Sequence, residues 1–361
     1  MMIEGEWMKM GEGIGMLNEE EETLADVWSL FTYSDGVVVG GRFNRAGNLQ
    51  TTSLAKFSNN IWSVPNFELK LSGQNTMLPY IKSITKIGEE FYFGGNFGQL
   101  KSSGPFSSEL GLACLMGSDL NLTFGYQPTS AIQQLTQGFF DEHGVNALAP
   151  YTFNNEDGVL IGGNFMFAGS IKVNGIAFIN NETSEISQIM DSEGNVGMEG
   201  PGTKEVHAFY QDSSMLYIGG VFQGMGGKSS FNIISMDQNQ SVQPLAGGLF
   251  TDLGVTTIIG DSNYIYAGGT VVGINNITDS VFANGIARYR RKLNRWDNMN
   301  GGISFFGIPA NVKAMAIHKG ELYVGGGGFT NAGDTISHGL IKWDGENWKT
   351  VYINGAKGLA G

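Results

Sequence analysis

The sequence predicts an all-β protein, a six-bladed β-propeller whose blades are four-stranded antiparallel sheets. Three observations support this prediction. A Gly-Gly motif occurs six times along the chain, the composition combines 55 glycines with only 15% charged residues, and the residues before each doublet are apolar at successive positions. Repeats of this length indicate stacked supersecondary units. We therefore expect residues 1–361 to form a single domain, with the six repeats over about 24–352.

Each copy of the motif is an apolar triplet followed by two glycines, one variable residue and usually a phenylalanine. The first glycines stand at positions 40, 94, 162, 219, 268 and 325. Successive apolar residues indicate a strand that is buried on both faces, as expected where blades pack face to face. The six copies are Val37–Phe43, Phe91–Phe97, Val159–Phe165, Leu216–Phe222, Ile265–Val271 and Leu322–Phe329.

Three further segments complete each four-stranded unit. A first strand is predicted upstream of each doublet by a segment with a β-branched residue, a variable residue and a small residue. These segments are Val27–Ser29, Ile81–Ser83, Val145–Ala147, Val206–Ala208, Val255–Thr257 and Val312–Ala314. Downstream, a Phe-x-x-Ala-Gly turn leads to a third strand, such as Gly175–Phe178, and Trp62, Trp296 and Trp348 mark fourth strands.

Glycine has two expected roles at the doublet. It lets the chain adopt a positive φ, and it lets a neighbouring backbone or aromatic ring come close. Either role predicts that a side chain at these positions strains the end of the strand.

The N-terminal segment predicts how the ring closes. Trp7–Ile14 matches Trp296–Ile303 in sequence, so a fourth-type strand over about 5–11 precedes the first repeat. A terminal strand that completes a blade removes an exposed sheet edge. The last repeat also carries its own candidate fourth strand, 347–351. The N-terminal strand is therefore either a fifth strand on the closing blade or the remnant of a preceding repeat.

The doublets and their aromatic strands resemble the kelch group of propellers, which includes the central domain of galactose oxidase. The chain is more similar still to the Gly-Gly repeats of fungal and bacterial cell-surface propellers, where a Trp-Asp-Gly-x-x-Trp segment follows. Trp343–Trp348 shows that segment in full. The resemblance covers nearly the whole chain and implies a propeller fold and a cell-surface setting, but it implies no particular activity.

Charge and cysteine content narrow the possible partners and compartments. The formal net charge is −13, which disfavours nucleic acid as a partner. No apolar run approaches the length of a membrane helix, so we expect no membrane insertion. A single cysteine excludes an intrachain disulfide. We expect an extracellular or cell-surface location, although no signal peptide is visible and a cytoplasmic location stays open.

Candidate binding residues are those that differ between copies. The middle residue of the first-strand segment varies among the copies, and these side chains either ring the mouth of a channel or simply tolerate variation at a wet surface. They are Trp28, Lys82, Asn146, His207, Thr256 and Lys313. Phe139 and Phe140 lie in the longest insertion, where they either face a partner or fold back and are buried.

The sequence specifies no catalytic residue, metal site or cofactor. The four histidines are scattered across the repeats, whereas zinc sites cluster their ligands. The copper site of galactose oxidase uses a Cys–Tyr crosslink, but Cys114 falls in an expected third strand and is interpreted as a buried structural thiol. Sialidases, also six-bladed, hold a carboxylate with an arginine cluster, and most arginines here fall in one hairpin, 288–295.

Two functional hypotheses follow. The first is a non-enzymatic propeller that serves as a protein-binding or structural module in a cell-surface, extracellular or multi-protein assembly. The alternative is a carbohydrate-binding or carbohydrate-active propeller with its site at the channel mouth. The first predicts a protein partner, and the second predicts a glycan.

Overall fold

The described strands of the computed structural model pair in antiparallel sheets, which confirms the all-β class. The single described helical element is a three-residue 3-10 turn, η2 (Arg291–Leu293), and no described helix is long and apolar enough to cross a membrane. The chain divides into two compact units, Met1–Gln188 and Ile189–Gly361. The structure describes residues 2–3, 6–7, 10–16, 25–33, 36–65, 68–70, 78–88, 90–97, 99–101, 112–116, 144–168, 171–183, 185–191, 193–327, 329–353 and 355–359.

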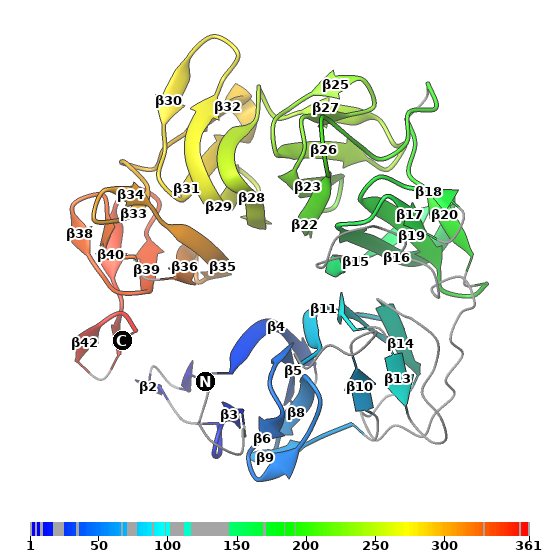
Figure 1. Ribbon diagram of the computed structural model, residues 1–361. Helices are drawn as coiled ribbons and strands as arrows, with labels where there is room; N and C mark the ends of the chain where they lie inside the picture. Colours follow the sequence, from blue (N-terminus) through cyan, green and yellow to red (C-terminus); the bar gives the residue numbers. More distant parts are fainter. Residues whose placement is uncertain are drawn as a thin grey trace. The chain divides into compact units, whose positions relative to one another are not determined.

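In the first unit, three sheets each carry one Gly-Gly doublet in their second strand, and we number them repeat sheets 1 to 3 (Figure 1). Repeat sheet 1 contains β4 (Asp26–Tyr33), β5 (Gly36–Arg42), β8 (Leu54–Ser58) and β9 (Ile61–Ser63). Repeat sheet 2 contains β11 (Tyr80–Ile87), β12 (Glu90–Asn96) and β14 (Leu112–Met116). Repeat sheet 3 contains β15 (Val145–Phe153), β16 (Glu156–Gly163), β19 (Ile176–Asn180) and β20 (Ile186–Gln188).

In the second unit, repeat sheets 4 to 6 have the same strand order. Repeat sheet 4 contains β22 (Glu205–Gln211), β23 (Met215–Val221), β26 (Ile233–Asp237) and β27 (Val242–Pro244). Repeat sheet 5 contains β28 (Leu249–Gly260), β29 (Tyr264–Asn275), β31 (Ile286–Arg290) and β32 (Arg295–Asp297), with β30 (Ser280–Phe282) on the far end of β29. Repeat sheet 6 contains β35 (Asn311–His318), β36 (Glu321–Gly327), β39 (Leu340–Trp343) and β40 (Trp348–Thr350).

Short strands connect or flank the repeat sheets. The predicted Phe-x-x-Ala-Gly turns form small hairpins whose strands are two residues long, such as β6 (Arg45–Ala46) with β7 (Leu49–Gln50). The others are β17 (Phe167–Ala168) with β18 (Ile171–Lys172), β24 (Gly224–Met225) with β25 (Lys228–Ser229), and β37 (Asn331–Ala332) with β38 (Thr335–Ile336). The remaining strands are β1 (Met2–Ile3), β2 (Glu6–Trp7), β3 (Ile14–Gly15), β10 (Glu68–Lys70), β13 (Gln99–Lys101), β21 (Met198–Glu199), β33 (Ile303–Phe305), β34 (Ile308–Pro309), β41 (Tyr352–Ile353) and β42 (Ala356–Lys357).

The predicted four-strand order is present in five repeat sheets, and the three described strands of repeat sheet 2 follow the same order. The first-strand segments, doublets and third strands pair in sequence, and the strands bearing Trp62, Trp296 and Trp348 are fourth in order. In repeat sheets 1 to 5 the doublet strands are buried at successive positions, as in Val38 and Val39 before Gly40, whereas in repeat sheet 6 Tyr323 is only half-buried between Leu322 and Val324. Part of the expected N-terminal strand is present as β2, which pairs with β1. Ring closure stays a prediction.

Repeat sheets within one unit pack in the same way. In the first unit, β11 packs against β4 and β5, and β15 packs against β11 and β12. In the second unit, β28 packs against β22 and β23, and β35 packs against β28 and β29. The hydrophobic core of the second unit therefore lies between successive sheets, with Val255 and Ile258 of β28 in one cluster with Tyr217 of β23.

The two glycines of a doublet meet different neighbours. A Cβ on Gly219 would lie 2.7 Å from Val255 Cγ1 and 2.8 Å from Ile258 Cδ1, so the first glycine admits the next sheet. A Cβ on Gly220 would collide with the carbonyl oxygen of Glu205 in its own sheet. Neither glycine has a positive φ. The close-approach role predicted from the sequence is correct, and the positive-φ role is wrong.

In three repeat sheets, a buried tryptophan of the fourth strand makes a hydrogen bond to the segment that precedes that sheet. Each indole donates from Nε1 to a backbone carbonyl, and the pairs are Trp62 to Met10 (2.9 Å), Trp296 to Leu245 (2.8 Å) and Trp348 to Met299 (2.8 Å). The sequence match between 7–14 and 296–303 is therefore also a match of role, because Met10 and Met299 accept equivalent hydrogen bonds.

Candidate functional site

The variable middle residue of every first strand is the extra residue of a β-bulge. In all six repeat sheets the pairing register shifts across this position, for example between Val206 and Ala208. A bulge leaves its extra residue outside the ladder and redirects the side chain. The six candidates Trp28, Lys82, Asn146, His207, Thr256 and Lys313 therefore share one backbone geometry.

Three of these six residues are linked by direct contacts in the first unit. The Trp28 and Tyr80 rings meet edge to face, with centroids 4.7 Å apart. Lys82 Nζ lies 5.5 Å from the Tyr80 ring centroid and donates to Asn146 Oδ1 at 2.8 Å. The contacts run across repeat sheets 1, 2 and 3 and bring Trp28, Lys82 and Asn146 into one cluster.

Arg42 extends this cluster from the end of β5. Its guanidinium carbon lies 5.7 Å from the Trp28 ring centroid, and its Nη2 donates to Asp26 Oδ2 at 2.5 Å. Asp26 and Arg42 face each other across the first and second strands of repeat sheet 1. We call Asp26, Trp28, Arg42, Tyr80, Lys82 and Asn146 the Arg42 cluster. The sequence pattern did not single out Arg42, Asp26 or Tyr80, although each flanks a position that it did.

The other three candidates make separate contacts in the second unit. The nearest partner of His207 Nε2 is Glu205 Oε2 at 2.8 Å, while its buried Nδ1 makes no hydrogen bond within the described residues. Thr256 Oγ1 donates to Val312 O at 2.7 Å and so joins repeat sheets 5 and 6. Lys313 is exposed. The contacts of the described residues do not join these three side chains to one another.

Several residues weighed in the sequence lie outside the described residues. These are Phe139 and Phe140, and one of the four histidines, His143. Cys114 lies in β14, the third strand of repeat sheet 2, where the sequence predicts it. In the part of the chain that the structure describes, no three His, Cys, Asp or Glu side chains gather as a group that could hold a metal ion.

The hairpin arginines are engaged in ion pairs within the protein. Arg288 and Arg290 both contact Asp297, Arg291 contacts Asp212, and Arg295 contacts Asp279. Arg288 also lies over the rings of Tyr264 and Trp343. These side chains hold strands together, so they do not form the unpaired cluster that a bound carboxylate would need.

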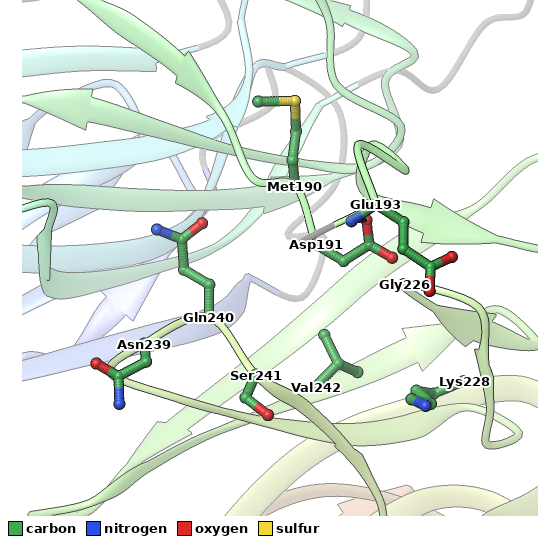
Figure 2. Close-up of a pocket in the computed structure, with 9 residues that line it drawn as sticks. All are labelled: Met190, Asp191, Glu193, Gly226, Lys228, Asn239, Gln240, Ser241 and Val242. Atoms are coloured by element: carbon green, nitrogen blue, oxygen red, sulfur yellow. Dashed lines mark hydrogen bonds between the residues drawn. The ribbon is translucent and has the colours of Figure 1, made fainter.

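A polar cavity of about 430 Å³ lies in the fourth repeat (Figure 2). Asp191 Oδ1 accepts hydrogen bonds from the backbone N–H groups of Glu193 and Asn195, and Oδ2 accepts one from the Asn195 side chain. The Asn195 hydrogen bond lowers the pKa of Asp191. The Asp191 carboxylate therefore stabilises the turn of residues 191–195 through these hydrogen bonds. The lining residues are Met190, Asp191, Glu193, Gly226, Lys228, Asn239, Gln240, Ser241 and Val242, and none of them is aromatic.

Apolar side chains are exposed where repeat sheet 5 departs from the common pattern. Phe250 and Phe282 both pair with Gly273, one on each side, and line an apolar cavity of about 260 Å³. Phe282 is 87% exposed. The hairpin of β33 and β34 adds Phe305, Phe306 and Ile308, and β34 packs against β29. We call these five residues the Phe282 patch. The sequence indicates this departure of repeat sheet 5 through its weak fifth copy of the motif, which has Thr270-Val271 where other copies have a variable residue and phenylalanine.

Comparisons with known proteins give little guidance. No protein-family model matches the chain, and no curated protein matches its sequence. Among solved structures, it is similar to the crystal structure of the computationally designed Ika8 protein, with 13% sequence identity and a TM-score of 0.42. That similarity covers 90% of this chain and 73% of the designed one. At this level it carries no argument about arrangement or function.

Proposed function

We propose that the chain is a non-enzymatic, single-domain β-propeller of six blades that serves as a protein-binding or structural module. Each repeat sheet supplies one blade. The support for this arrangement is the constant packing inside each unit, where a first strand lies against the preceding sheet. A propeller continues that packing around a closed ring.

The exposure of repeat sheets 1 and 6 also favours a ring. Val27 and Leu30 are 44% and 65% exposed, whereas Val255 and Val312, at the position of Val27 in later sheets, are fully buried. In repeat sheet 6, a Cβ on Gly325 would meet no atom closer than 3.8 Å, although the equivalent Cβ on Gly219 would be crowded. A ring would cover both faces, because every blade then has a neighbour on each side.

The observation that carries the binding function is the Phe282 patch. Exposed apolar patches on soluble proteins mark interaction sites, and Phe250 and Phe282 flank one exposed apolar cavity in this part of the chain. Phe250 and Phe282 lie on the extended strands of repeat sheet 5, and Phe305, Phe306 and Ile308 lie on the β33–β34 hairpin that follows it. Segments outside the common repeat are where binding residues concentrate. Aromatic residues are also the anchors most enriched at protein interfaces. We further propose a cell-surface or extracellular setting, on the strength of the resemblance to cell-surface propellers.

Affinity capture from an extract of the native source tests this function. The bait is the full chain, compared with a Phe282→Ser/Phe306→Ser double variant. Ile61→Ser is the matched control, because Ile61 is an exposed apolar residue on β9 of the other unit. We expect one stoichiometric protein partner with the wild type and the control, and its loss with the double variant. Recovery of no partner, or equal recovery by all three baits, would contradict the proposal.

A further inference from the structure

Asn-Gly pairs are the sites where a protein chain deamidates most readily, because glycine has no side chain to hinder attack by its own backbone nitrogen. This chain has four, which begin at Asn174, Asn284, Asn300 and Asn354, and Asn354 lies outside the described residues. In the reaction, the glycine nitrogen attacks the side-chain carbonyl carbon of the asparagine. A hydrogen bond from the glycine N–H holds that nitrogen in place, so the folded structure decides which pair can react.

Two of the described pairs have a glycine N–H that is already bonded. Gly175 donates to the carbonyl oxygen of Phe165 at 2.7 Å, and Gly285 donates to that of Val271 at 2.8 Å. Both glycines are buried. Breaking a buried hydrogen bond leaves the donor and the acceptor without a partner, which is unfavourable. The folded structure therefore protects these two pairs.

The pair Asn300-Gly301 lacks this protection. The N–H of Gly301 makes no hydrogen bond within the described residues, and Gly301 is only half-buried. Asn300 is exposed in the turn between β32 and β33, and its Nδ2 donates to the carbonyl oxygen of Glu346 at 2.8 Å. Because the side chain is exposed, water can replace that partner when the side chain turns toward the backbone. Nucleophile and carbonyl carbon are both accessible here.

We propose that Asn300 is a site of spontaneous deamidation. The Gly301 nitrogen forms a bond to Asn300 Cγ and gives its proton to solvent, the side-chain amide leaves as ammonia, and a cyclic imide closes. Water then opens the imide at either of its two carbonyl carbons, which leaves aspartate or isoaspartate at position 300. The net reaction consumes water and releases ammonia, with no oxidation or reduction. It is independent of the proposed binding function.

Deamidation at this position affects the attachment of repeat sheet 6. The product has no side-chain amide to donate to Glu346, and it carries a carboxylate beside that carbonyl oxygen. The preceding residue, Met299, accepts the hydrogen bond from Trp348 Nε1 at 2.8 Å. Isoaspartate also lengthens the backbone next to this acceptor. We therefore expect the modification to weaken the link between the fourth strand of repeat sheet 6 and the turn that precedes the sheet.

Incubation of the full chain in a mildly alkaline buffer, followed by peptide mass spectrometry, tests the proposal. We expect the peptide with Asn300 to gain aspartate and isoaspartate forms, while the peptides with Asn174 and Asn284 keep their asparagines. A parallel incubation in concentrated urea is the matched control, because unfolding exposes all three glycine N–H groups. There the three sites should deamidate at similar rates, which assigns the difference in the folded protein to its hydrogen bonds.

Three results would overturn the proposal. They are equal deamidation of the three sites in the folded protein, no isoaspartate at Asn300 over a time in which the unfolded chain forms it, and a preference for Asn300 that persists in urea.

Asn300→Asp measures the consequence for stability. Its urea midpoint should lie below that of the wild type. Asn263→Asp is the control, since it adds the same charge at an exposed turn between β28 and β29, where the Asn263 side chain makes no hydrogen bond within the described residues. It should leave the midpoint nearly unchanged. Equal midpoints for the two variants would contradict the role assigned to the hydrogen bond with Glu346.

Discussion

Alanine at Gly219 and at Gly220 adds the same methyl group to adjacent residues of β23, but the two methyl groups meet different obstacles. At Gly219 the methyl points at the side chains of Val255 and Ile258, 2.7 and 2.8 Å away. At Gly220 it points at the backbone carbonyl of Glu205, closer than the 3.0 Å that real Cβ atoms respect. Side chains can change rotamer, whereas a carbonyl in a strand ladder moves only with its strand.

The difference in cost follows from what has to move. Gly219→Ala overpacks a core in which two aliphatic side chains can shift, which costs about 1–3 kcal/mol. Gly220→Ala forces β22 and β23 apart beside the bulge at His207, where Glu205 pairs with Val221 and Val206 with Gly220. Loss of those backbone hydrogen bonds, together with the clash, costs roughly 3–5 kcal/mol. That is a large part of the stability of an ordinary domain.

Urea unfolding followed by tryptophan fluorescence measures both costs. Gly327→Ala is the control, since a Cβ there meets nothing within 4 Å and its φ is not positive. It should stay within about 0.5 kcal/mol of the wild type or gain slightly, because alanine restricts the unfolded chain. From the most to the least stable, the expected order of the variants is therefore Gly327→Ala, Gly219→Ala and Gly220→Ala. If Gly220→Ala were as stable as the control, the steric account of the second glycine would be wrong.

Two further predictions concern the second unit. Trp296→Phe should lower the free energy of unfolding in urea by about 1–2 kcal/mol more than Trp343→Phe. Both indoles are 1% exposed, but Trp296 donates to a buried carbonyl, whereas Trp343 Nε1 has no partner among the described residues. Equal losses of stability in the two variants would argue against a contribution from the Trp296 hydrogen bond. Burial raises the pKa of Tyr217 and Tyr266 to about 12. The unfolded chain loses these protons at lower pH, so this contribution to stability is complete below about pH 10 and is lost as the pH rises toward 12. Tyrosinate absorbance should show these two rings ionising late in the folded protein, and a single transition near pH 10 would refute the burial argument.

The strand order was predictable because each strand carries a local signal. Apolar triplets such as Val37–Val39 mark strands buried on both faces, and Trp62 or Trp348 marks a fourth strand by its position after a polar turn. Each of these signals involves residues that are close together in the sequence, and the apolar character of those residues indicates which strands are buried. The role of the glycines was only half predictable, because a close approach and a positive φ select the same residue and only the backbone separates them.

The contacts of the candidate site were less accessible to sequence reasoning. The contacts from Arg42 through Trp28 and Tyr80 to Lys82 join repeat sheets 1 and 2, which lie one repeat apart in the sequence. No local pattern encodes which side chains of successive sheets meet. Likewise, Phe282 on β30 is exposed, but an apolar residue in a strand looks the same in sequence whether it is buried or exposed.

The bulge explains why the middle residue of the first-strand segment can vary between copies. A residue inside a ladder is constrained on two sides, since its side chain must fit cross-strand neighbours and the adjacent sheet. The bulged residue is released from that pairing, so its side chain can change without cost to the ladder. The same release brings Trp28, Lys82 and Asn146 within contact of neighbouring sheets. Tolerance of variation and contact with neighbouring sheets are therefore two consequences of one backbone feature. The second glycine of the doublet packs against a carbonyl beside that bulge, as Gly220 does against Glu205.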